Sequence, residues 1–257
     1  MNIIEISVVI PTYNRPLLLV DALDSILNQS KQPNEVIVID DYRINFEEQK
    51  NYFNNHYYDK LNSFSYISNK GKNGVSSARN LGAKIAKGNV LAFLDDDDFW
   101  HEDYLHKIEK YLLQGFDIVC SSFIEIKKNV EIFEKIAPTK LKTNDFFFKN
   151  PGFRGSNIAI KTKIFEKVGG FDENLKSRND LDLGIRLSLI EDLKYYGLKE
   201  RLVYWRNHSG YRLSRKTNNK KESVMMFYNK YKDLMTHEEK EKHKKHVYYL
   251  WKIRIAD

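Results

Sequence analysis

The sequence predicts an α/β protein built on a doubly wound, mostly parallel sheet. Residues 6–10 and 35–39 are short runs rich in Val and Ile that read as buried strands, and apolar residues recur at helical spacing between them. Two strands joined through a helix imply a right-handed crossover and therefore a parallel pair. At 257 residues, the chain can form one large α/β domain with a sizeable core and a modest appendage.

The first half of the chain continues this alternation of strands and helices. Pro16 suits the first turn of the helix after the first strand, and Gln32-Pro33 ends that helix. The further elements expected here are a helix over 46–58, a strand over 64–67, a helix that follows Gly74 and stops at Gly88, and a strand over 89–94.

The second half predicts more strands and a helical extension. We expect a helix to about residue 113, a strand over 117–126 paired with 131–133, a strand over 158–160, a helix around 163–168, a helix that opens at 178–180, and a short strand over 202–206. Beyond residue 215 the character changes to two Lys-rich helices, over 222–235 and 238–255. The predicted organisation is a domain over 1–215 and a basic, aromatic helical tail over 216–257.

The net charge of +7 belongs to the C-terminal part of the chain. Residues 1–198 carry 26 Lys and Arg against 28 Asp and Glu, whereas residues 199–257 carry 16 against 7. A basic tail can attract phosphate-rich partners such as anionic lipid headgroups or nucleic acid, or it can be a solvated helical face. It reads either as a lid packed on the domain, which we favour, or as a helix on a membrane surface.

Several protein classes are excluded by composition. No apolar run approaches the roughly 20 residues needed to span a bilayer, and the N-terminus lacks the basic start and the cleavage site of a signal peptide. The single Cys120 lies in an apolar run, which excludes a disulfide framework and indicates a buried thiol. These features fit a protein of the reducing cytoplasm.

The strand over 89–94 ends in four adjacent aspartates, residues 95–98. Four neighbouring carboxylates at the mouth of a buried strand repel one another and lose hydration, which folding alone gives no reason to accept. A hard divalent cation such as Mg²⁺ or Mn²⁺ would remove this cost, because such ions prefer oxygen ligands and substrate phosphates. The alternative is a solvated acidic turn, and the spacing does not match an EF-hand.

Other polar residues fall near the same predicted edge of the sheet. Ligands of open α/β sheets bind outside the carboxyl ends of the strands, where Asp40, Asp41 and the four aspartates would meet. Arg79, in the first turns of its helix, favours a phosphate or a nucleobase, although an exposed helical Arg is often only solvated. Asp180 lies in or near the first turn of another helix, where a carboxylate is often only a cap.

The order of six short motifs resembles the inverting family 2 glycosyltransferases of the GT-A fold. The motifs are Val9-Ile10-Pro11-Thr12-Tyr13-Asn14-Arg15, Val38-Ile39-Asp40-Asp41, Gly74 through Ala78-Arg79-Asn80-Leu81-Gly82, Phe93-Leu94-Asp95-Asp96-Asp97-Asp98, Gly169-Gly170-Phe171-Asp172 and Asn179-Asp180. Each is weak alone, but together and in order they make chance agreement improbable. The resemblance covers residues 7 to about 210 and leaves the tail outside.

The resemblance implies a role for each matching residue. Asp41, with Asp40 beside it, would bind the uracil or ribose of a nucleotide-sugar, and Arg79 would assist there. Pro11, Tyr13 and Arg15 would line the nucleotide pocket. Asp95 would face the sugar-nucleotide and Asp97 the metal, with Asp180 as the catalytic base. Asp96 is grouped with the donor-binding carboxylates, although its place between them, like that of Asp98, also fits spacing or support. His208 resembles a position that can approach the diphosphate or the metal, but an isolated His in a turn is more often surface.

The implied activity is metal-dependent transfer of a hexosyl group with inversion, using Mn²⁺ or Mg²⁺. The donor would be a nucleotide-sugar, with a UDP-sugar favoured, and the acceptor a hydroxyl of a glycan or lipid-linked molecule in bacterial surface polysaccharide synthesis. The enzyme would be cytoplasmic, with peripheral membrane contact through the tail and no nucleic-acid partner.

Two departures and two rival functions accompany this interpretation. Asn179 stands where the family often has Glu, and residues 42–45 replace a small Ser/Thr-rich turn, so donor contacts can differ. A nucleotidyltransferase would require a Gly-rich basic loop after the first strand, and the chain has Pro11-Thr12-Tyr13-Asn14 instead. A non-catalytic binding protein would use the basic tail and show steep salt dependence.

Overall fold

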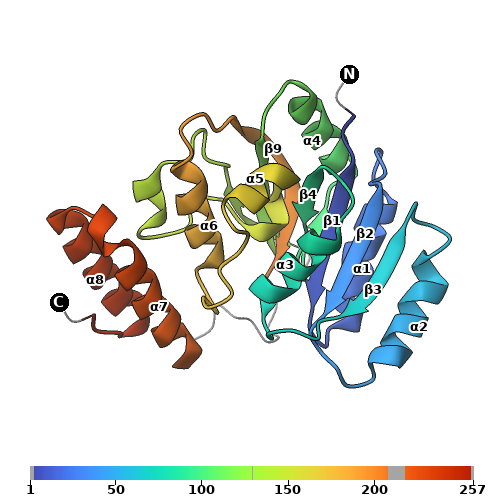
Figure 1. Ribbon diagram of the computed structural model, residues 1–257, viewed down its shortest axis with the longest axis horizontal. Helices are drawn as coiled ribbons and strands as arrows, with labels where there is room; N and C mark the ends of the chain where they lie inside the picture. The colour runs from blue at the N-terminus through green and yellow to red at the C-terminus, as the bar shows by residue number, and fades with distance from the viewer. Residues whose placement is uncertain (1–2, 129, 208–217, 256–257) are drawn as a thin grey trace.

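The computed structural model describes residues 3–128, 130–207 and 218–255, and its frame is a nine-stranded sheet. The N-terminal half is parallel, with strands in the spatial order β3-β2-β1-β4 (Figure 1). These strands are β1 (Ile6–Thr12), β2 (Glu35–Asp40), β3 (Phe64–Ser68) and β4 (Val90–Phe93). The predicted parallel crossover is therefore confirmed, and it brings the carboxyl ends of β1, β2 and β4 to one edge.

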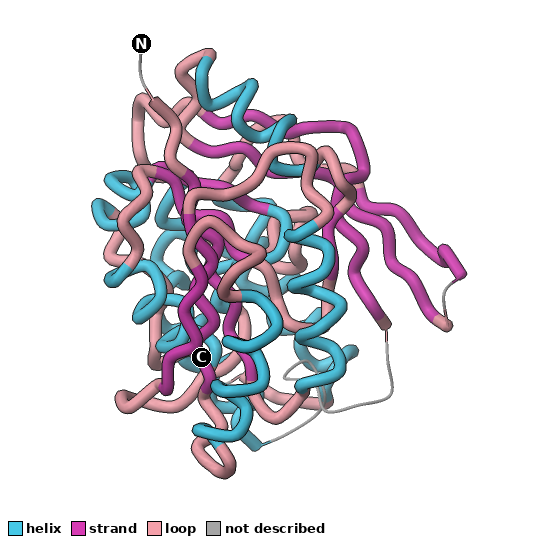
Figure 2. Tube along the Cα trace, turned by 90° about the vertical axis from the view of Figure 1, so that its right-hand side faces the viewer, coloured by secondary structure: helices cyan, strands magenta, loops and turns pink. Residues whose placement is uncertain are grey.

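Beyond β4 the sheet becomes mixed. Strand β8 (Ile158–Lys161) lies antiparallel between β4 and β6 (Ile118–Lys127), and β9 (Tyr195–Arg206) runs parallel to β6. The two-residue strand β5 (Phe99–Trp100) pairs with β9, and β7 (Val130–Lys135) pairs with β6, as the sequence predicted. Figure 2 shows the β6–β7 hairpin and the end of β9 projecting beyond the helices.

Helices cover both faces of the sheet because alternate strand residues are apolar on both sides. Val8 and Ile10 pack with α1 (Pro16–Leu27), α2 (Phe46–Tyr57) and α4 (Tyr104–Leu113) in one core. Val9 packs in the other core, whose helices are α3 (Val75–Ile85), α5 (Thr162–Lys167) and α6 (Asn179–Ser188). Short 3-10 turns, η1 (Thr143–Phe146) and η2 (Gly155–Asn157), precede β8.

The C-terminal segment contributes to the second core. It forms α7 (Asn218–Tyr231), the turn η3 (Lys232–Leu234) and α8 (His237–Trp251), at the left of Figure 1. Val224, Phe227 and Val247 are fully buried and belong to the same apolar cluster as Leu91 and Phe93 of β4. Among the described residues, no helix has both the length and the apolar character needed to cross a membrane.

The expected bounds differ from the structure mainly in β9. The sequence predicts a strand over 202–206, whereas β9 begins at Tyr195. Charged residues at 199–201 interrupt the apolar pattern, because this part of the strand is exposed. A glycine lets the strand start earlier, since a Cβ at Gly197 would lie 2.1 Å from the carbonyl oxygen of Pro138.

We expect Phe227→Ala to lower the free energy of unfolding by about 3–5 kcal/mol, because it empties a buried aromatic site shared by α7 and the core. Met226→Ala is the matched control, since Met226 is 44% exposed on the same helix and its truncation should cost less than about 1 kcal/mol. Urea unfolding of both variants measures the difference. Equal, small effects would show that α7 does not pack on the domain in solution.

Candidate functional site

The four aspartates alternate between buried and accessible positions at the end of β4. Asp96 and Asp98 are 0% and 2% exposed, whereas Asp95 and Asp97 are partly exposed. A turn at Asp96 and Asp97 produces this alternation. Two carboxylates therefore anchor the loop in the protein, and two are presented at its surface.

Asp96 is held by the end of β1. Thr12 Oγ1 donates to Asp96 Oδ2 over 2.7 Å, and Arg15 Nε donates to the same oxygen over 3.1 Å. Arg15 Nη1 also donates to Asp97 Oδ2 over 2.8 Å, so this guanidinium bridges a buried and an accessible carboxylate. Burial raises the pKa of Asp96 to about 7, although the charge of Arg15 acts in the opposite direction.

Asp98 is anchored on the other side of the loop. Ser156 Oγ donates to Asp98 Oδ2 over 2.6 Å, and the backbone N–H of Arg206 donates to Oδ1 over 3.1 Å. Burial, reinforced by the neighbouring Asp97 and Asp95, raises the pKa of Asp98 well above its ordinary value. The pKa values of Asp96 and Asp98 are thus raised mainly by burial, and the neighbouring carboxylates add to the shift.

Three of the aspartates could hold a metal ion. Asp95, Asp97 and Asp98 each offer a carboxylate oxygen, and these oxygens lie within 4.8 Å of one another. An all-oxygen set of this kind suits Mg²⁺ or Mn²⁺ rather than a soft metal. The residues present therefore fit such an ion, with Asp98 joining the Asp97 expected from sequence.

Arg79 connects this acidic loop to α6. Its side chain is 3% exposed, and Nη2 donates to Asp95 Oδ1 over 2.5 Å while Nη1 lies 3.5 Å from Asp180 Oδ1. The guanidinium stacks on the ring of Phe171, with Cζ 4.9 Å from the ring centroid. A Cβ at Gly155 would lie 2.3 Å from Arg79 Nη2, so the absence of a side chain there makes room for the guanidinium.

Asp180 does not cap its helix through its side chain. The side chain faces Arg79 and the backbone N–H of Gly155, both outside α6, and the backbone N–H of Asp180 donates to Asn179 Oδ1 over 3.0 Å. Asp180 Oδ1 is closed off from water and accepts no hydrogen bond from the described residues. Burial raises the pKa of Asp180, although the charge of Arg79 opposes this shift. A partly buried carboxylate with a raised pKa and a free lone pair is suited to accept a proton.

The end of β2 supplies a second acidic pair beside the loop. Asp40 is 2% exposed and accepts bonds from the Tyr42 backbone N–H and the Tyr66 hydroxyl, both over 2.8 Å. Asp41 accepts from Asn69 Nδ2 over 2.7 Å and from the Gly74 N–H over 2.6 Å. Burial raises the pKa of Asp40, against the lowering effect of its two hydrogen bonds.

Tyr13 and Pro11 lie at different depths at the end of β1. Pro11 is buried within the strand, and Tyr13 is 50% exposed with its ring 5.2 Å from that of Tyr42. A small hollow between these strand ends is lined by Thr12, Asn14, Arg15, Pro16, Leu19, Asp40, Tyr42, Gln49 and Tyr66. His208, which the family resemblance suggests as a residue near the diphosphate or the metal, lies outside the described residues.

Three contributors were not predicted as site residues. Ser156 links Asp98 to the backbone N–H of Asp95, which lies 3.1 Å from its Oγ. Arg154 stacks on Trp205, with Cζ 4.4 Å from a ring centroid, and its charge acts on Asp180. Asp98 was recognised only as a spacing or supporting group. Arg154 and Ser156 flank a glycine in a polar loop, and that pattern is too common to identify a site.

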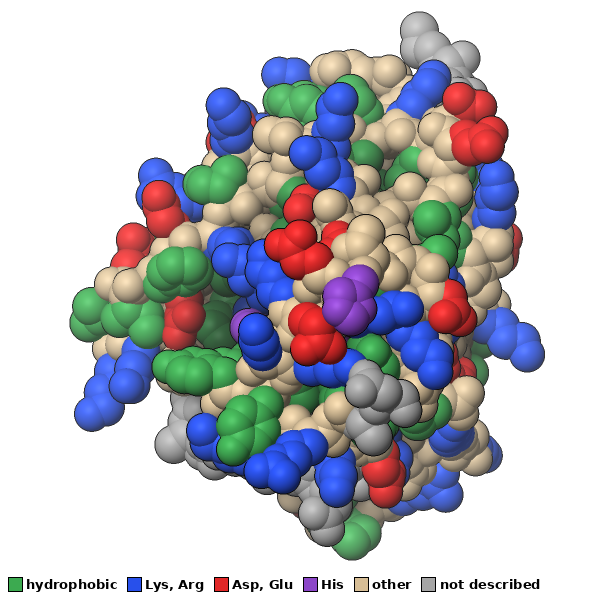
Figure 3. Space-filling view, turned by 90° about the vertical axis from the view of Figure 1, so that its left-hand side faces the viewer, with side chains coloured by type: hydrophobic (Ala, Val, Ile, Leu, Met, Phe, Trp, Pro, Cys, Tyr) green, Lys and Arg blue, Asp and Glu red, His purple; other side chains and the backbone are tan. Residues whose placement is uncertain are grey.

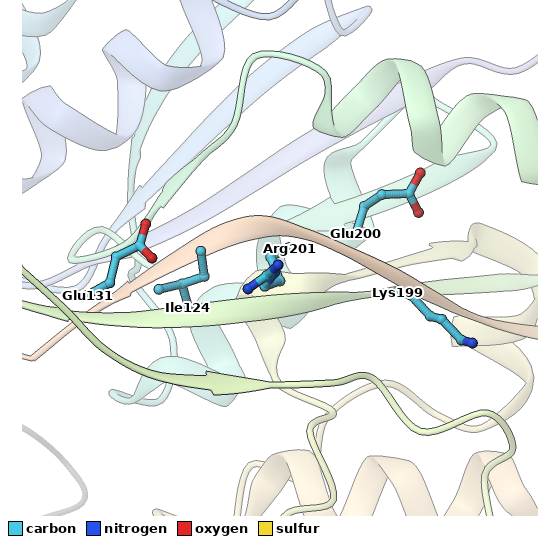
Figure 4. Close-up of a pocket in the computed structure, with 5 residues that line it drawn as sticks. All are labelled: Ile124, Glu131, Lys199, Glu200 and Arg201. Carbon is cyan, nitrogen blue, oxygen red and sulfur yellow. The ribbon is translucent and has the colours of Figure 1, made fainter.

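A wider surface hollow lies away from these residues. Its lining residues are Ile124, Glu131, Lys199, Glu200 and Arg201 on β6, β7 and β9, with Glu131 and Lys199 at opposite ends (Figure 4). None of the aspartates at the end of β4 lines it. Its charged residues alternate in sign, and Arg201 is paired with Glu134. The strand ends, rather than this hollow, therefore form the candidate site.

Comparisons with known proteins identify the family of the chain. Residues 7–169 match the model of a family described as glycosyl transferase family 2. An uncharacterised glycosyltransferase of Methanocaldococcus jannaschii is 30% identical over 256 residues, which cover 96% of this chain and 84% of that protein. The amylovoran biosynthesis glycosyltransferase AmsB of Erwinia amylovora is 31% identical over 197 residues, which cover 72% of this chain and 64% of AmsB.

A solved structure shares the fold. Residues 1–349 of TarS from S. aureus, crystallised with UDP-GlcNAc, align with a TM-score of 0.70 and 18% identity over 96% of this chain and 74% of that chain. The GT-A fold predicted from the sequence motifs is thereby confirmed. At this level of identity the likeness concerns the fold alone.

We expect Gly155→Ala to destabilise the protein by about 1–3 kcal/mol, because its Cβ would overlap the buried guanidinium of Arg79. In an Arg79→Ala background the same change should cost little, since the obstructing group is gone. A double-mutant cycle from urea unfolding measures this coupling. Gly71→Ala is the control, because its Cβ would meet ordinary contacts. Equal costs of Gly155→Ala in both backgrounds would contradict the arrangement.

Proposed function

Because this chain belongs to glycosyl transferase family 2, we propose that it is a metal-dependent inverting hexosyltransferase. It transfers a sugar from a nucleotide-sugar, with a UDP-sugar favoured, to a hydroxyl of a glycan or lipid-linked acceptor. The single observation that carries the proposal is Arg79, whose guanidinium reaches both Asp95 and Asp180. It brings a cation-binding loop and a proton acceptor to one site, as displacement at a sugar carbon requires.

The donor half of the site is assigned to the ends of β1 and β2. Asp41 and Asp40 bind the uracil or ribose, Tyr13 and Arg15 line the nucleotide pocket with Pro11 behind them, and Arg79 assists. The exposed ring of Tyr13, resting on Tyr42, offers a face on which a base can stack. The UDP-GlcNAc bound to TarS, a protein of the same fold, supports a UDP-sugar as donor.

The metal half of the site is assigned to the loop after β4. Asp97, with Asp98 and Asp95 beside it, would hold Mg²⁺ or Mn²⁺, which supplies electrostatic stabilisation to the departing diphosphate. Asp96 supports this loop from inside by fixing Arg15. His208 remains a further candidate ligand by its place in the sequence.

Asp180 is assigned as the general base. Its carboxylate accepts the proton of the acceptor hydroxyl as that oxygen attacks the anomeric carbon of the donor, from the face opposite the leaving nucleoside diphosphate. One displacement inverts the configuration, and no enzyme-bound intermediate forms. The positive charge of Arg79 favours the carboxylate form of Asp180 and so opposes the rise in its pKa that burial causes.

The acceptor class is assigned from the name of a relative and from the surface of the tail. The name of AmsB refers to amylovoran biosynthesis, which supports a surface polysaccharide as the product class. Tyr249 is 78% exposed on α8, among the Lys residues of the tail, and such a surface suits peripheral contact with an anionic membrane. We place the enzyme on the cytoplasmic side of that membrane.

A screen of nucleotide-sugars with Mn²⁺ or Mg²⁺ tests the activity, with donor hydrolysis or transfer as the readout. We expect one donor class to be used only when metal is present. Failure of the folded protein to bind any nucleoside diphosphate in a metal-linked manner would refute the enzyme assignment.

We expect Asp97→Asn to weaken metal affinity by about 100-fold or more and to lower turnover in parallel, since a charged ligand is lost. Excess Mn²⁺ should restore part of the rate. Asp59→Asn, an exposed carboxylate on the far side of the parallel strands from β4, is the control and should leave metal activation unchanged. Calorimetric titration of Mn²⁺ in the presence of UDP measures the affinity. Unchanged metal affinity in Asp97→Asn would contradict the ligand assignment.

We expect Asp180→Asn to lower kcat by about 10²–10⁴-fold with little change in donor binding, because only proton transfer is lost. In the wild type, kcat/KM should fall as the pH drops through the raised pKa of Asp180, since the base works only when unprotonated. This acid limb should lie above the range of an ordinary Asp and disappear in the variant. Residual activity within about 3-fold of wild type would exclude Asp180 as the base.

A further inference from the structure

Arg178 is a half-buried cation that lies against two aromatic rings and forms no hydrogen bond with the described residues. Its Nε, Nη1 and Nη2 are all closed off from water, and none forms a hydrogen bond with the described residues. Arg79 and Arg186 are paired with carboxylates, Arg79 with Asp95 and Arg186 with Asp182. Burial lowers the pKa of Arg178 to about 10, and no carboxylate acts against this shift. The N–H donors of the guanidinium therefore lack hydrogen-bond acceptors in the described part of the chain.

Its backbone adds a second cost. Arg178 has φ +64°, the left-handed region that non-glycine residues rarely adopt, and it stands immediately before α6. An unpaired buried donor is destabilising, and more so when it is charged. A ligand that pairs with the guanidinium would offset the cost of the unpaired donors.

Two aromatic rings of the tail lie against the guanidinium of Arg178, with Cζ 5.1 Å from the Phe227 ring centroid and 5.0 Å from that of Trp251. These rings contact the cation but accept no hydrogen bond from its N–H groups in the described part of the chain. Phe227 is fully buried, whereas Trp251 is half-buried at the end of α8.

A second buried polar atom without a partner lies in the same cluster. His243 is 0% exposed, and its Nδ1 bonds the carbonyl of Phe147 over 2.6 Å, whereas Nε2 bonds nothing in the described part of the chain. Burial and the charge of Arg178 lower the pKa of His243 to about 4. Burial lowers the pKa of His246, and the charges of Arg178 and Lys149 add to this shift. The groups that act on this cluster are cations, and Figure 3 shows basic side chains across the face that carries the tail.

We propose that Arg178 binds a phosphate group held between α6 and the tail helices. The N–H edge of a guanidinium matches two phosphate oxygens. The positive end of the α6 dipole adds to the attraction. A phosphate here would lie at the start of the helix that carries Asp180, two residues along the chain.

The phosphate can belong to the acceptor or to a membrane headgroup, and both offer the same chemistry. The acceptor assignment rests on the proposed function, in which Asp180 activates the acceptor hydroxyl. The phosphate-binding site does not rest on the proposed function, because phosphate binding can be measured without donor, metal or turnover.

The first experiment measures thermal unfolding with inorganic phosphate in EDTA, against acetate at equal ionic strength. We expect phosphate to raise the Tm of the wild type by about 4 °C at about ten times its Kd, and acetate to have no effect. Arg178→Met keeps the stacked chain but removes the donors, and it should abolish the rise. Lys245→Met removes an exposed cation of the same tail and should preserve it. A phosphate effect that is absent in the wild type, retained in Arg178→Met or equalled by acetate would overturn the proposal.

A second measurement needs no variant. Bound phosphate adds negative charge beside His243, so it should raise the pKa of His243 from about 4 towards the ordinary value near 6.5. NMR titration of the imidazole, with and without phosphate, follows this shift in the wild type. If the pKa of His243 stays unchanged at saturating phosphate, the proposal is overturned, even if Arg178→Met fails to fold.

Two arms then identify the source of the phosphate. If it belongs to the acceptor, Arg178→Met should raise the KM for a glycosyl phosphate acceptor by about 10-fold or more while donor hydrolysis stays normal. If it belongs to a lipid, the variant should lose binding to phosphatidylglycerol vesicles over phosphatidylcholine vesicles. Loss in either arm supports the site, and loss in neither overturns it. Failure of donor hydrolysis in the wild type would refute the proposed function alone, because phosphate binding is measured separately.

Discussion

The buried guanidinium of Arg79 is paired with two carboxylates, and the arrangement of this site follows from where those carboxylates come from. Its partners, Asp95 and Asp180, come from the end of β4 and the start of α6. Room for it depends on Gly155, and its face rests on Phe171. The end of β4 and three positions between residues 155 and 180 are therefore brought together around a single side chain. Asp180 on α6 is placed beside the loop after β4 because both contribute a carboxylate to the same guanidinium.

The loop after β4 resolves its electrostatic conflict by dividing its carboxylates. Asp96 and Asp98 enter the protein and are stabilised by Thr12, Arg15 and Ser156. Each buried carboxylate is thus held by hydroxyl or guanidinium donors, which offset part of its lost hydration. The two accessible carboxylates are paired with Arg79 and Arg15, which compensate part of the negative charge of the loop. The anchoring of Asp98 also brings its carboxylate near those of Asp95 and Asp97, in a set of oxygens that could hold a divalent cation.

Periodicity in the sequence was sufficient for the frame of the fold, and less so for the details of the site. Parallel strands with carboxyl-end aspartates follow from runs such as 35–39, and the acidic motifs fall where those strands end. Which of four identical neighbours turns inward depends on partners over 50 residues away, such as Ser156, and adjacent aspartates carry no signal of it. The start of β9 was missed because its exposed residues are charged. Arg178 reads as an ordinary surface residue until the tail covers it.

The helix α6 joins the site to the C-terminal tail through carboxylates on opposite sides. Asp180 turns towards Arg79, whereas the buried Asp182 accepts bonds from Lys230 Nζ and the Tyr231 hydroxyl, each over 2.6 Å. Residues at i and i+2 of a helix point in nearly opposite directions, so the tail fixes the rotation of α6 that aims Asp180 at the site. Residue 215 is therefore a boundary in composition but not in packing. Occupation of the cluster around Arg178, at the same helix end, would act on the position of Asp180 directly.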